Sequence, residues 1–363
     1  MSDAPLKSLP LHHLHVAAGA RFAPFAGWNM PTRYGAIKDE HMAVRTRAGL
    51  FDVSHMGEVF VRGAGAVDAL NALVTNDLRR LQDGQALYTV MCYPDGGVVD
   101  DLIIYRLAAD ELLVCVNASN RAKDFEWICT HIDGSVDVSD DSDSWVQLAL
   151  QGPHAVGIAT SVWPSLAAVA PFGVVREPSV CDGAIVARTG YTGEDGFEFY
   201  VPVRSAEDVA LQLMEAGRSS ELGWIGLAAR DSLRLEARLP LYGHELSAEI
   251  NPVEAGLSWV VKLDKPEFIG QQALAAVTAS GPARRLRGLI LEGRGMLREG
   301  YQVFCDGRPI GTTTSGSVAF AAQEATIALA LLDAEFCNLP AVDVAIRDRL
   351  VPARVVKSPF YRR

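Results

Sequence analysis

Two adjacent carboxylates, Asp100 and Asp101, stand inside an apolar stretch that runs from Val98 to Ile104. The turn signal Pro-Asp-Gly-Gly at 94–97 precedes it, so the sequence predicts a hairpin whose returning strand carries both acids. Side chains alternate across a strand, which sends the two carboxylates to opposite faces. An inward carboxylate is costly unless it is paired or serves a ligand, and the alternative is a strand end with both acids hydrated.

A second isolated acid, Glu198, lies in the otherwise apolar stretch Phe197–Val201. The segment before it, Gly190–Gly196, holds three glycines in seven residues, which predicts a tight loop whose backbone approaches a neighbour or a ligand closely. Tyr191 and Glu194 lie in this loop. An acid in an apolar strand beside such a loop is a candidate for binding a polar ligand.

Metal chemistry has weak support. His12, His13 and His15 form a histidine cluster without a nearby cysteine or acid, and we interpret them as helix or turn residues. The acid-rich segment 137–143 lacks the central glycine and final glutamate of a calcium loop, which favours a solvated turn. The sequence predicts no metal site.

Two other chemistries have partial motifs. Asp52, Ser54 and His55 are residue types of a serine hydrolase, but the chain has no G-x-S-x-G elbow. The strand–glycine–helix order around Gly63 imitates a dinucleotide fingerprint, yet Asp68 stands where the third glycine is needed. We therefore set aside both classes.

The totals describe a globular, acidic chain. It has 363 residues, 49% of them hydrophobic and 21% charged, and its formal charge is 33 − 44 = −11. The length favours two or three domains, and the acidic balance without a basic stripe argues against nucleic acid. Six scattered cysteines without a C-x-x-C pair indicate reduced core residues and a cytoplasmic location. No run reaches the roughly 18 apolar residues of a membrane helix, so we expect no membrane association.

The elements that must position these acids alternate between helix and strand over the first 280 residues, with many hairpin signals. That pattern favours an α+β fold over a doubly wound parallel sheet. From about Leu286, short strands separated by glycine turns predict a separate antiparallel β domain. The segment Phe25–Pro31, rich in aromatics, is interpreted as a loop.

Five segments in this order together resemble the T-protein (aminomethyltransferase) family of the glycine cleavage system. They are Phe25–Pro31, Glu40–Met56, Gly96–Tyr105, Thr189–Glu198 and Ala229–Leu246. The resemblance spans nearly the whole chain. It departs from the family at Ala228 and Arg238, where members usually carry glycine, and near Ser315, where a Ser-Pro pair is usual.

The resemblance implies three domains around a central folate cavity. Two are interleaved α+β domains of ferredoxin-like or Greek-key character, and the third is an antiparallel β-barrel or jelly-roll-like domain. We expect the first domain in 1–55 and 140–225, the second in 56–139 and 226–280, and the third in 281–363.

The resemblance also implies an activity in glycine catabolism and one-carbon metabolism. The aminomethyl group on the dihydrolipoyl arm of the H-protein passes to tetrahydrofolate, a co-substrate, which yields ammonia and 5,10-methylenetetrahydrofolate. A carboxylate can stabilise the iminium-like cation of this transfer and handle the folate protons, and Asp100 is the matched residue. Asp101 is left to a solvent-side or scaffold role.

The remaining matched positions are binding candidates. A pterin has a donor edge that a carboxylate accepts in bidentate fashion, and Glu198 matches that role. The other candidates are Arg230, Tyr191, Asn117, Tyr88, Tyr105, Tyr242 and Arg362. For Tyr88, Tyr105 and Tyr242 the alternative is ordinary packing. Arg362 is the weaker basic choice because Arg363 is adjacent.

Two rival functions share this resemblance. A folate-dependent demethylase acting on a methylated amine or sulfonium would keep the folate residues and differ at the donor entrance. A non-catalytic folate-binding factor would carry a K-G-C-x-x-G-Q-E segment. The corresponding stretch here, Leu239–Glu245, has no cysteine, which argues against the second rival.

Overall fold

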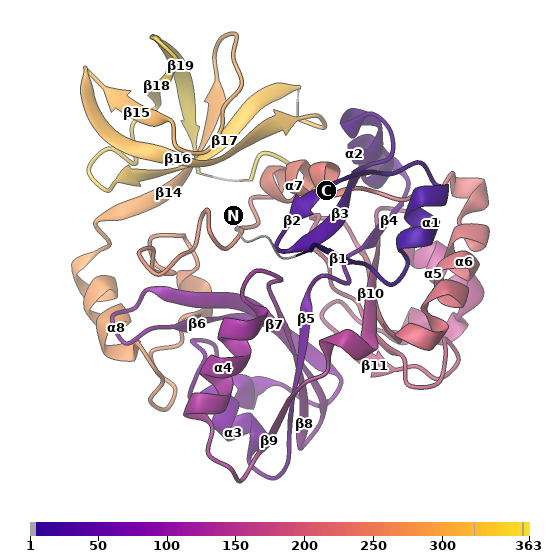
Figure 1. The fold of residues 1–363 in the computed structure, drawn as a ribbon. Helices are drawn as coiled ribbons and strands as arrows, with labels where there is room; N and C mark the ends of the chain where they lie inside the picture. The colour runs from indigo at the N-terminus through magenta and orange to yellow at the C-terminus, as the bar shows by residue number, and fades with distance from the viewer. Residues whose placement is uncertain (1–4, 323, 358) are drawn as a thin grey trace. The chain divides into compact units, whose positions relative to one another are not determined.

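The computed structural model describes residues 5–322, 324–357 and 359–363, shown as a ribbon in Figure 1. The chain divides into two compact units, each built from segments far apart in sequence. Unit 1 comprises the residues up to Leu70, Leu78–Tyr88 and Leu102–Arg230, and unit 2 comprises Asn71–Asp77, Thr89–Asp101 and Asp231–Arg363. The boundaries of the three expected domains stay a prediction.

Helices and strands are mixed along the chain, as the sequence predicts. The helices are α1 (His12–Ala17), α2 (Ile37–Thr46), α3 (Ala66–Asn71), α4 (Arg121–His131), α5 (Ala155–Val162), α6 (Ala206–Ala216), α7 (Leu227–Glu236) and α8 (Gln271–Ser280). The strands before the barrel are β1 (Lys7–Ser8), β2 (Arg21–Phe25), β3 (Trp28–Arg33), β4 (Gly49–Asp52), β5 (Gly57–Arg62), β6 (Gln85–Cys92), β7 (Val98–Ala108), β8 (Glu111–Val116), β9 (Asp137–Asp140), β10 (Trp145–Gln151), β11 (Val174–Arg176), β12 (Ile185–Ala187) and β13 (Gly196–Pro202).

The first large sheet of unit 1 has the order β11-β12-β13-β10-β4. Its central strands β13 and β10 pair antiparallel, with Glu198 opposite Ala149 and Tyr200 opposite Gln147. Alternate residues of both strands, such as Leu148 and Phe199, enter a core cluster that includes residues of α5 and α6. The pleat therefore turns Gln147, Glu198 and Tyr200 to the opposite face.

A second sheet has the order β6-β7-β8-β5-β9. Phe60 of β5, Leu113 of β8 and Tyr105 of β7 lie in one row of this sheet. They form a buried cluster with Ile185 and Tyr200 of the first sheet. In unit 1 the two sheets thus pack face to face, and the polar side chains of β10 and β13 lie in the layer between them.

The segment Phe25–Pro31 is part of a hairpin, so its interpretation as a loop is wrong. Strands β2 and β3 pair antiparallel around Ala26 and Gly27, whose φ angles are 48° and 81°. Two successive positive φ angles make the tight turn whose twist suits a hairpin. Pro24 and Pro31 conceal these strands in the sequence, because proline is uncommon inside sheets.

The C-terminal part of unit 2 is a closed antiparallel barrel of the order β14-β17-β16-β15-β18-β19. Its strands are β14 (Arg284–Leu291), β15 (Gln302–Cys305), β16 (Arg308–Ala319), β17 (Ala325–Asp333), β18 (Ala341–Ile346) and β19 (Arg349–Val356). The orange-to-yellow strands of Figure 1 belong to it. Inward aliphatic residues fill the barrel, and closure leaves no free sheet edge. The predicted α+β class and C-terminal β domain are confirmed.

Two early segments are held inside unit 2. The Lys265 ammonium donates to the carbonyl oxygens of Asn71, Val74 and Asn76 at 2.6–2.7 Å. At Gly97 a Cβ would lie 1.8 Å from the carbonyl oxygen of Ala248, so only glycine fits this close approach. Lys265 and Gly97 therefore hold segments 71–77 and 89–101 against residues far along the chain.

Arg238 explains one departure from the family pattern. It lies just past α7 with φ 59°, a left-handed conformation that favours glycine. Its guanidinium donates to the carbonyl oxygens of Leu286, at 2.9 Å, and Lys357. These bonds offset the backbone strain. Ala228, the other departure, lies on α7 at an ordinary helical position.

Candidate functional site

Glu198 lies at the centre of a buried hydrogen-bond network in unit 1. Its Oε1 accepts from Gln147 Nε2 at 3.0 Å. Its Oε2 accepts from Thr189 Oγ1 at 2.5 Å and from the Tyr105 hydroxyl at 3.3 Å. Only 5% of Glu198 is exposed, so the carboxylate depends on these three donors rather than on bulk water.

Gln147 and Tyr200 complete the network. The Gln147 amide nitrogen also donates to the Tyr200 hydroxyl at 3.1 Å, and that hydroxyl donates to Tyr105 at 2.9 Å. Burial raises the pKa of Tyr105 and Tyr200 well above the ordinary tyrosine value, so both remain hydroxyl donors. Sequence reasoning missed Gln147, although a glutamine between apolar residues of a strand was a usable signal.

The glycine-rich loop 190–196 is held at its centre and at its C-terminal end. At Gly196 a Cβ would lie 2.1 Å from the Leu150 carbonyl oxygen, so a side chain is excluded. Arg45 of α2 donates to Glu194 Oε1 and to the Thr192 carbonyl oxygen, each at 2.8 Å. The predicted close approach of backbone in this loop is thus seen, and Glu194 has a structural role.

Tyr191 and Arg230 are brought together by the same loop and the first half of α7. The Arg230 guanidinium carbon lies 4.6 Å from the centroid of the Tyr191 ring, a cation–π contact. Burial lowers the pKa of Arg230, while Tyr191 and Glu198 act in the opposite direction. An arginine keeps its positive charge at neutral pH under such conditions. The pair offers a cation and an aromatic wall.

His55 is a neutral histidine near Arg230. Burial, followed by the Arg230 charge, lowers the pKa of His55 to about 3, while Asp52 acts to raise it. Its Nδ1 is buried without a hydrogen-bond partner among the described residues. Asp52, Ser54 and His55 do not form a hydrolase triad, as the sequence predicts. Ser54 donates to Asp52 at 2.5 Å, and Asp52 pairs with His15 at 2.8 Å instead.

We expect His55 to make the protein acid-sensitive. Because the pKa of His55 falls on folding, His55 binds fewer protons in the folded than in the unfolded state at acidic pH. The contribution of His55 to the free energy of unfolding is therefore complete above pH 6.5 and is lost as the pH falls toward 3. The loss should approach about 1.4 kcal/mol per pH unit. In urea unfolding from pH 7.5 to 4.5, His55→Asn should flatten the decline relative to wild type. His13→Gln, at a half-exposed histidine, is the control, and equal slopes for His55→Asn and wild type would contradict the assignment.

The other candidates lie in different places. Tyr88 of β6 and Asn117, just after β8, belong to unit 1 and are partly buried. Tyr242 and Arg362 belong to unit 2, where the Tyr242 hydroxyl donates to the Val98 carbonyl oxygen at 3.3 Å and Arg362 is exposed. Among the predicted binding residues, Glu198 contacts Tyr105 and Arg230 contacts Tyr191.

Asp100 and Asp101 are both buried, at 0% and 9% exposure, so neither is a hydrated strand-end acid. Of the two roles expected for Asp101, the solvent-side one is therefore wrong and the scaffold one stays a prediction. Along β7, alternation places Asp101 on the face that carries Ile103 and Tyr105, and Asp100 on the other face. Tyr105, on the face of β7 that also carries Asp101, donates to Glu198 at 3.3 Å. The catalytic role of either carboxylate stays a prediction.

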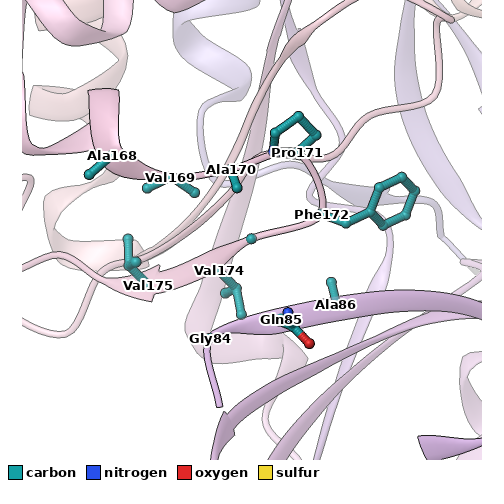
Figure 2. A pocket seen from close by; sticks show the side chains of 11 residues that line it. Gly84, Gln85, Ala86, Ala168, Val169, Ala170, Pro171, Phe172, Val174 and Val175 are labelled. Atoms are coloured by element: carbon teal, nitrogen blue, oxygen red, sulfur yellow. The ribbon is translucent and has the colours of Figure 1, made fainter. Parts of the chain in front are cut away.

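Unit 1 also contains a cavity of about 450 Å³ (Figure 2). None of the residues that line it belongs to the Glu198 hydrogen-bond network. Its walls are Gly84, Gln85, Ala86 and residues 168–175. These residues are apolar apart from Gln85 and none is titratable, so this cavity offers no acid–base chemistry.

No group of three or more His, Cys, Asp or Glu side chains that could hold a metal occurs within the described residues. None of the described helices is long and apolar enough to cross a membrane.

The chain combines an α+β architecture with a closed C-terminal barrel, and comparisons with known proteins identify its family. Family descriptions match as "GCVT N-terminal domain" over residues 11–265 and "Glycine cleavage T-protein C-terminal barrel domain" over residues 284–362. The chain belongs to the glycine cleavage T-protein family.

Relatives in other organisms agree over the full length. The chain is 46% identical to an aminomethyltransferase of Geobacillus kaustophilus over 362 residues and 47% identical to one of Moorella thermoacetica over 363, covering 99% of each chain. The crystal structure of aminomethyltransferase T of the glycine cleavage system from Bartonella henselae superposes with a TM-score of 0.93 at 35% identity, covering 98% of both chains. The predicted family and enzyme class, an aminomethyltransferase, are confirmed.

Proposed function

We propose that this enzyme transfers the one-carbon unit of S-aminomethyl-dihydrolipoyl H-protein to tetrahydrofolate, releasing ammonia and forming 5,10-methylenetetrahydrofolate. Membership of the T-protein family supports the reaction class. The observation that carries the folate part is Glu198, a buried carboxylate held by three donors in a layer of aromatic side chains.

Glu198 suits the polar edge of a pterin. Its oxygens point into a layer lined by Tyr105 and Tyr200, and a carboxylate can accept two parallel N–H bonds from the ring nitrogen and the exocyclic amine. The hydroxyl and amide donors around Glu198 set its orientation before the ligand arrives. Such preorganisation reduces the cost of binding.

Arg230 and Tyr191 suit the rest of the folate molecule. The Tyr191 ring offers a face to the p-aminobenzoyl group, and Arg230 offers positive charge to the glutamate carboxylates. Tyr88, Asn117, Tyr242 and Arg362 stay proposed contacts on the strength of the resemblance.

The transfer itself needs a carboxylate. Loss of the dihydrolipoyl thiolate or of ammonia from the N–CH2–S unit passes through an iminium-like cation, which a nearby negative charge stabilises. Formation of the methylene bridge then removes protons from the folate nitrogens, which requires a base. We assign these roles to the Asp100–Asp101 pair of β7 and, from the strand alternation, to Asp101 rather than the sequence-predicted Asp100.

The partner is the lipoyl-bearing H-protein, and a cytoplasmic location stays a prediction.

The decisive experiment measures ammonia release from aminomethylated H-protein with tetrahydrofolate, beside dimethylglycine and a sulfonium donor. Release only from the H-protein substrate supports the proposal. Turnover of a methylated donor alone would reassign the enzyme as a demethylase, and folate binding without any turnover would make it a binding factor.

Glu198→Gln should weaken tetrahydrofolate binding by about 1–3 kcal/mol, because one acceptor oxygen becomes a donor that faces a donor edge. Titration calorimetry measures the change in Kd. Glu207→Gln, at an exposed acid of α6, is the matched control and should bind normally. An unchanged Kd in folded Glu198→Gln would leave Glu198 a structural role only.

A further inference from the structure

Glu58 is a buried acid that the proposed reaction does not use. It lies in β5 of unit 1 with 1% of its surface exposed. Its backbone is fully engaged: the N–H donates to Ser142 Oγ at 2.7 Å, and the carbonyl oxygen accepts from the Asp141 N–H at 3.0 Å. Its side-chain Oε1, in contrast, is buried without a hydrogen-bond partner among the described residues. A carboxyl group in that position is costly unless something else engages it.

The side chain of Glu58 projects into the layer that holds the Glu198 network. Glu58 is the direct antiparallel partner of Cys115 on β8, so both side chains lie on the same face of the sheet. The Cys115 thiol lies 3.7 Å from Gln147 Oε1, and Gln147 Nε2 donates to Glu198. The Cys115 thiol and the Gln147 amide thus lie between Glu58 and Glu198 in this layer.

The protonation of Glu58 follows from its neighbours. Burial raises the pKa of Glu58 well above the ordinary value, and the acids Asp140, Asp143 and Glu198 raise it further. Arg121 is the opposing charge, but its guanidinium donates at 2.7 Å to both Asp140 and Asp143. The raised pKa favours the neutral carboxyl form of Glu58, which has an O–H donor as well as an acceptor oxygen.

Resting on the proposed function, we propose that Glu58 is a specificity residue that donates its O–H to the 4-oxo group of the bound pterin. A 4-oxopterin carries two N–H donors next to a carbonyl acceptor. Glu198 accepts from the donors, and a neutral Glu58 supplies the missing donor for the carbonyl. Two acids in one layer, one charged and one neutral, then recognise an edge that a single carboxylate would recognise only in part.

This arrangement should reject 2,4-diaminopteridines. Replacing the 4-oxo group with an amine puts an N–H donor opposite the Glu58 O–H donor, and sites that satisfy a specific polar group discriminate strongly against analogues that lack it. We expect the wild-type enzyme to bind tetrahydrofolate at least about tenfold more tightly than its 4-amino counterpart, tetrahydroaminopterin.

The test is titration calorimetry of wild-type enzyme, Glu58→Gln and Glu58→Leu with both ligands. Glu58→Gln has an amide that can donate or accept, so the ratio of the two Kd values should fall toward one, mainly by tighter binding of the 4-amino ligand. Glu58→Leu removes the donor and should weaken tetrahydrofolate binding by about tenfold. Glu111→Gln, an acid at the outer end of β8 that pairs with Arg62, is the control and should keep the wild-type ratio.

Failure of the inference differs from failure of the proposed function. Wild-type enzyme that binds no tetrahydrofolate overturns the proposed function. Wild-type enzyme that binds both ligands equally overturns the inference alone, and this measurement needs no folded variant. A folded Glu58→Gln enzyme with an unchanged ratio also overturns it and leaves Glu58 to packing.

Discussion

Replacing Asp101 with asparagine should lower kcat by about 10²–10⁴-fold while tetrahydrofolate affinity changes little. Asparagine keeps the shape and can still hydrogen-bond, but it has neither the negative charge nor the proton-accepting oxygen. If the carboxylate stabilises the iminium-like transition state, its loss appears in kcat rather than in ground-state binding. Single-turnover ammonia release and folate calorimetry measure the two quantities separately.

Asp100 is the matched control, one residue away on the opposite face of β7. Asp100 is fully buried, and its strand face carries the apolar Leu102 and Ile104. Asp100→Asn should therefore lower the melting temperature while kcat changes little. The reverse result, a well-folded but inactive Asp100→Asn enzyme beside an active Asp101→Asn enzyme, would return the catalytic role to Asp100, the residue that the sequence resemblance selects.

Removing the carboxylate of Glu245 should destabilise unit 2 by about 3–5 kcal/mol. Glu245 is fully buried, and its Oε2 accepts from Arg234 Nη1 at 2.7 Å. Its Oε1 accepts from the hydroxyls of Thr314 and Ser315 on β16, at 2.5 and 2.6 Å. Glu245→Ala removes the buried partner of Arg234, whose remaining carboxylate is the half-exposed Asp231 at 2.8 Å. It also removes the acceptor of the Thr314 and Ser315 hydroxyls, and the two losses together account for the size of the effect.

Chemical unfolding at pH 7 measures this loss. Glu335→Ala removes the partner of Arg308 in an exposed ion pair, both side chains being about 60% exposed, and should cost less than about 1 kcal/mol. The double variant Arg234→Met with Glu245→Leu removes both charges and should recover part of the stability. Equal losses in Glu245→Ala and Glu335→Ala would show that the buried pair contributes no more than a surface pair.

The sequence indicates which acidic residues are unusual, but it does not show which side chains surround them in the fold. Glu198 is visible because an acid in an apolar strand is unusual, and the barrel is visible from its short strands and glycine turns. Gln147 is visible only as a glutamine between apolar residues of a strand, because its bond to Glu198 forms across 51 residues when β10 pairs with β13. Similarly, alternation shows that Asp100 and Asp101 face opposite ways, but only the contact between Tyr105 and Glu198 shows which face holds the network.

Local signals failed where longer-range structure determined the outcome. Ser205 has the sequence signature of a helix cap, yet its side chain makes no capping bond to α6. The hairpin of β2 and β3 was missed because prolines argue against strands, whereas β2 lies at the edge of its small sheet, where proline is tolerated. The left-handed Arg238 could be suspected only from the family's preference for glycine at that position.

The interleaving of the two units has a consequence for synthesis on the ribosome. The chain passes from one unit to the other five times, at 70/71, 77/78, 88/89, 101/102 and 230/231. Unit 1 lacks its last segment until Arg230 has been made, and segments 71–77 and 89–101 must wait for the residues beyond 231 that hold them, among them Lys265. Contacts of such long sequence separation fold slowly. We therefore expect nascent chains to remain sensitive to protease until translation nears the barrel, and Lys265→Met to prolong that sensitive interval.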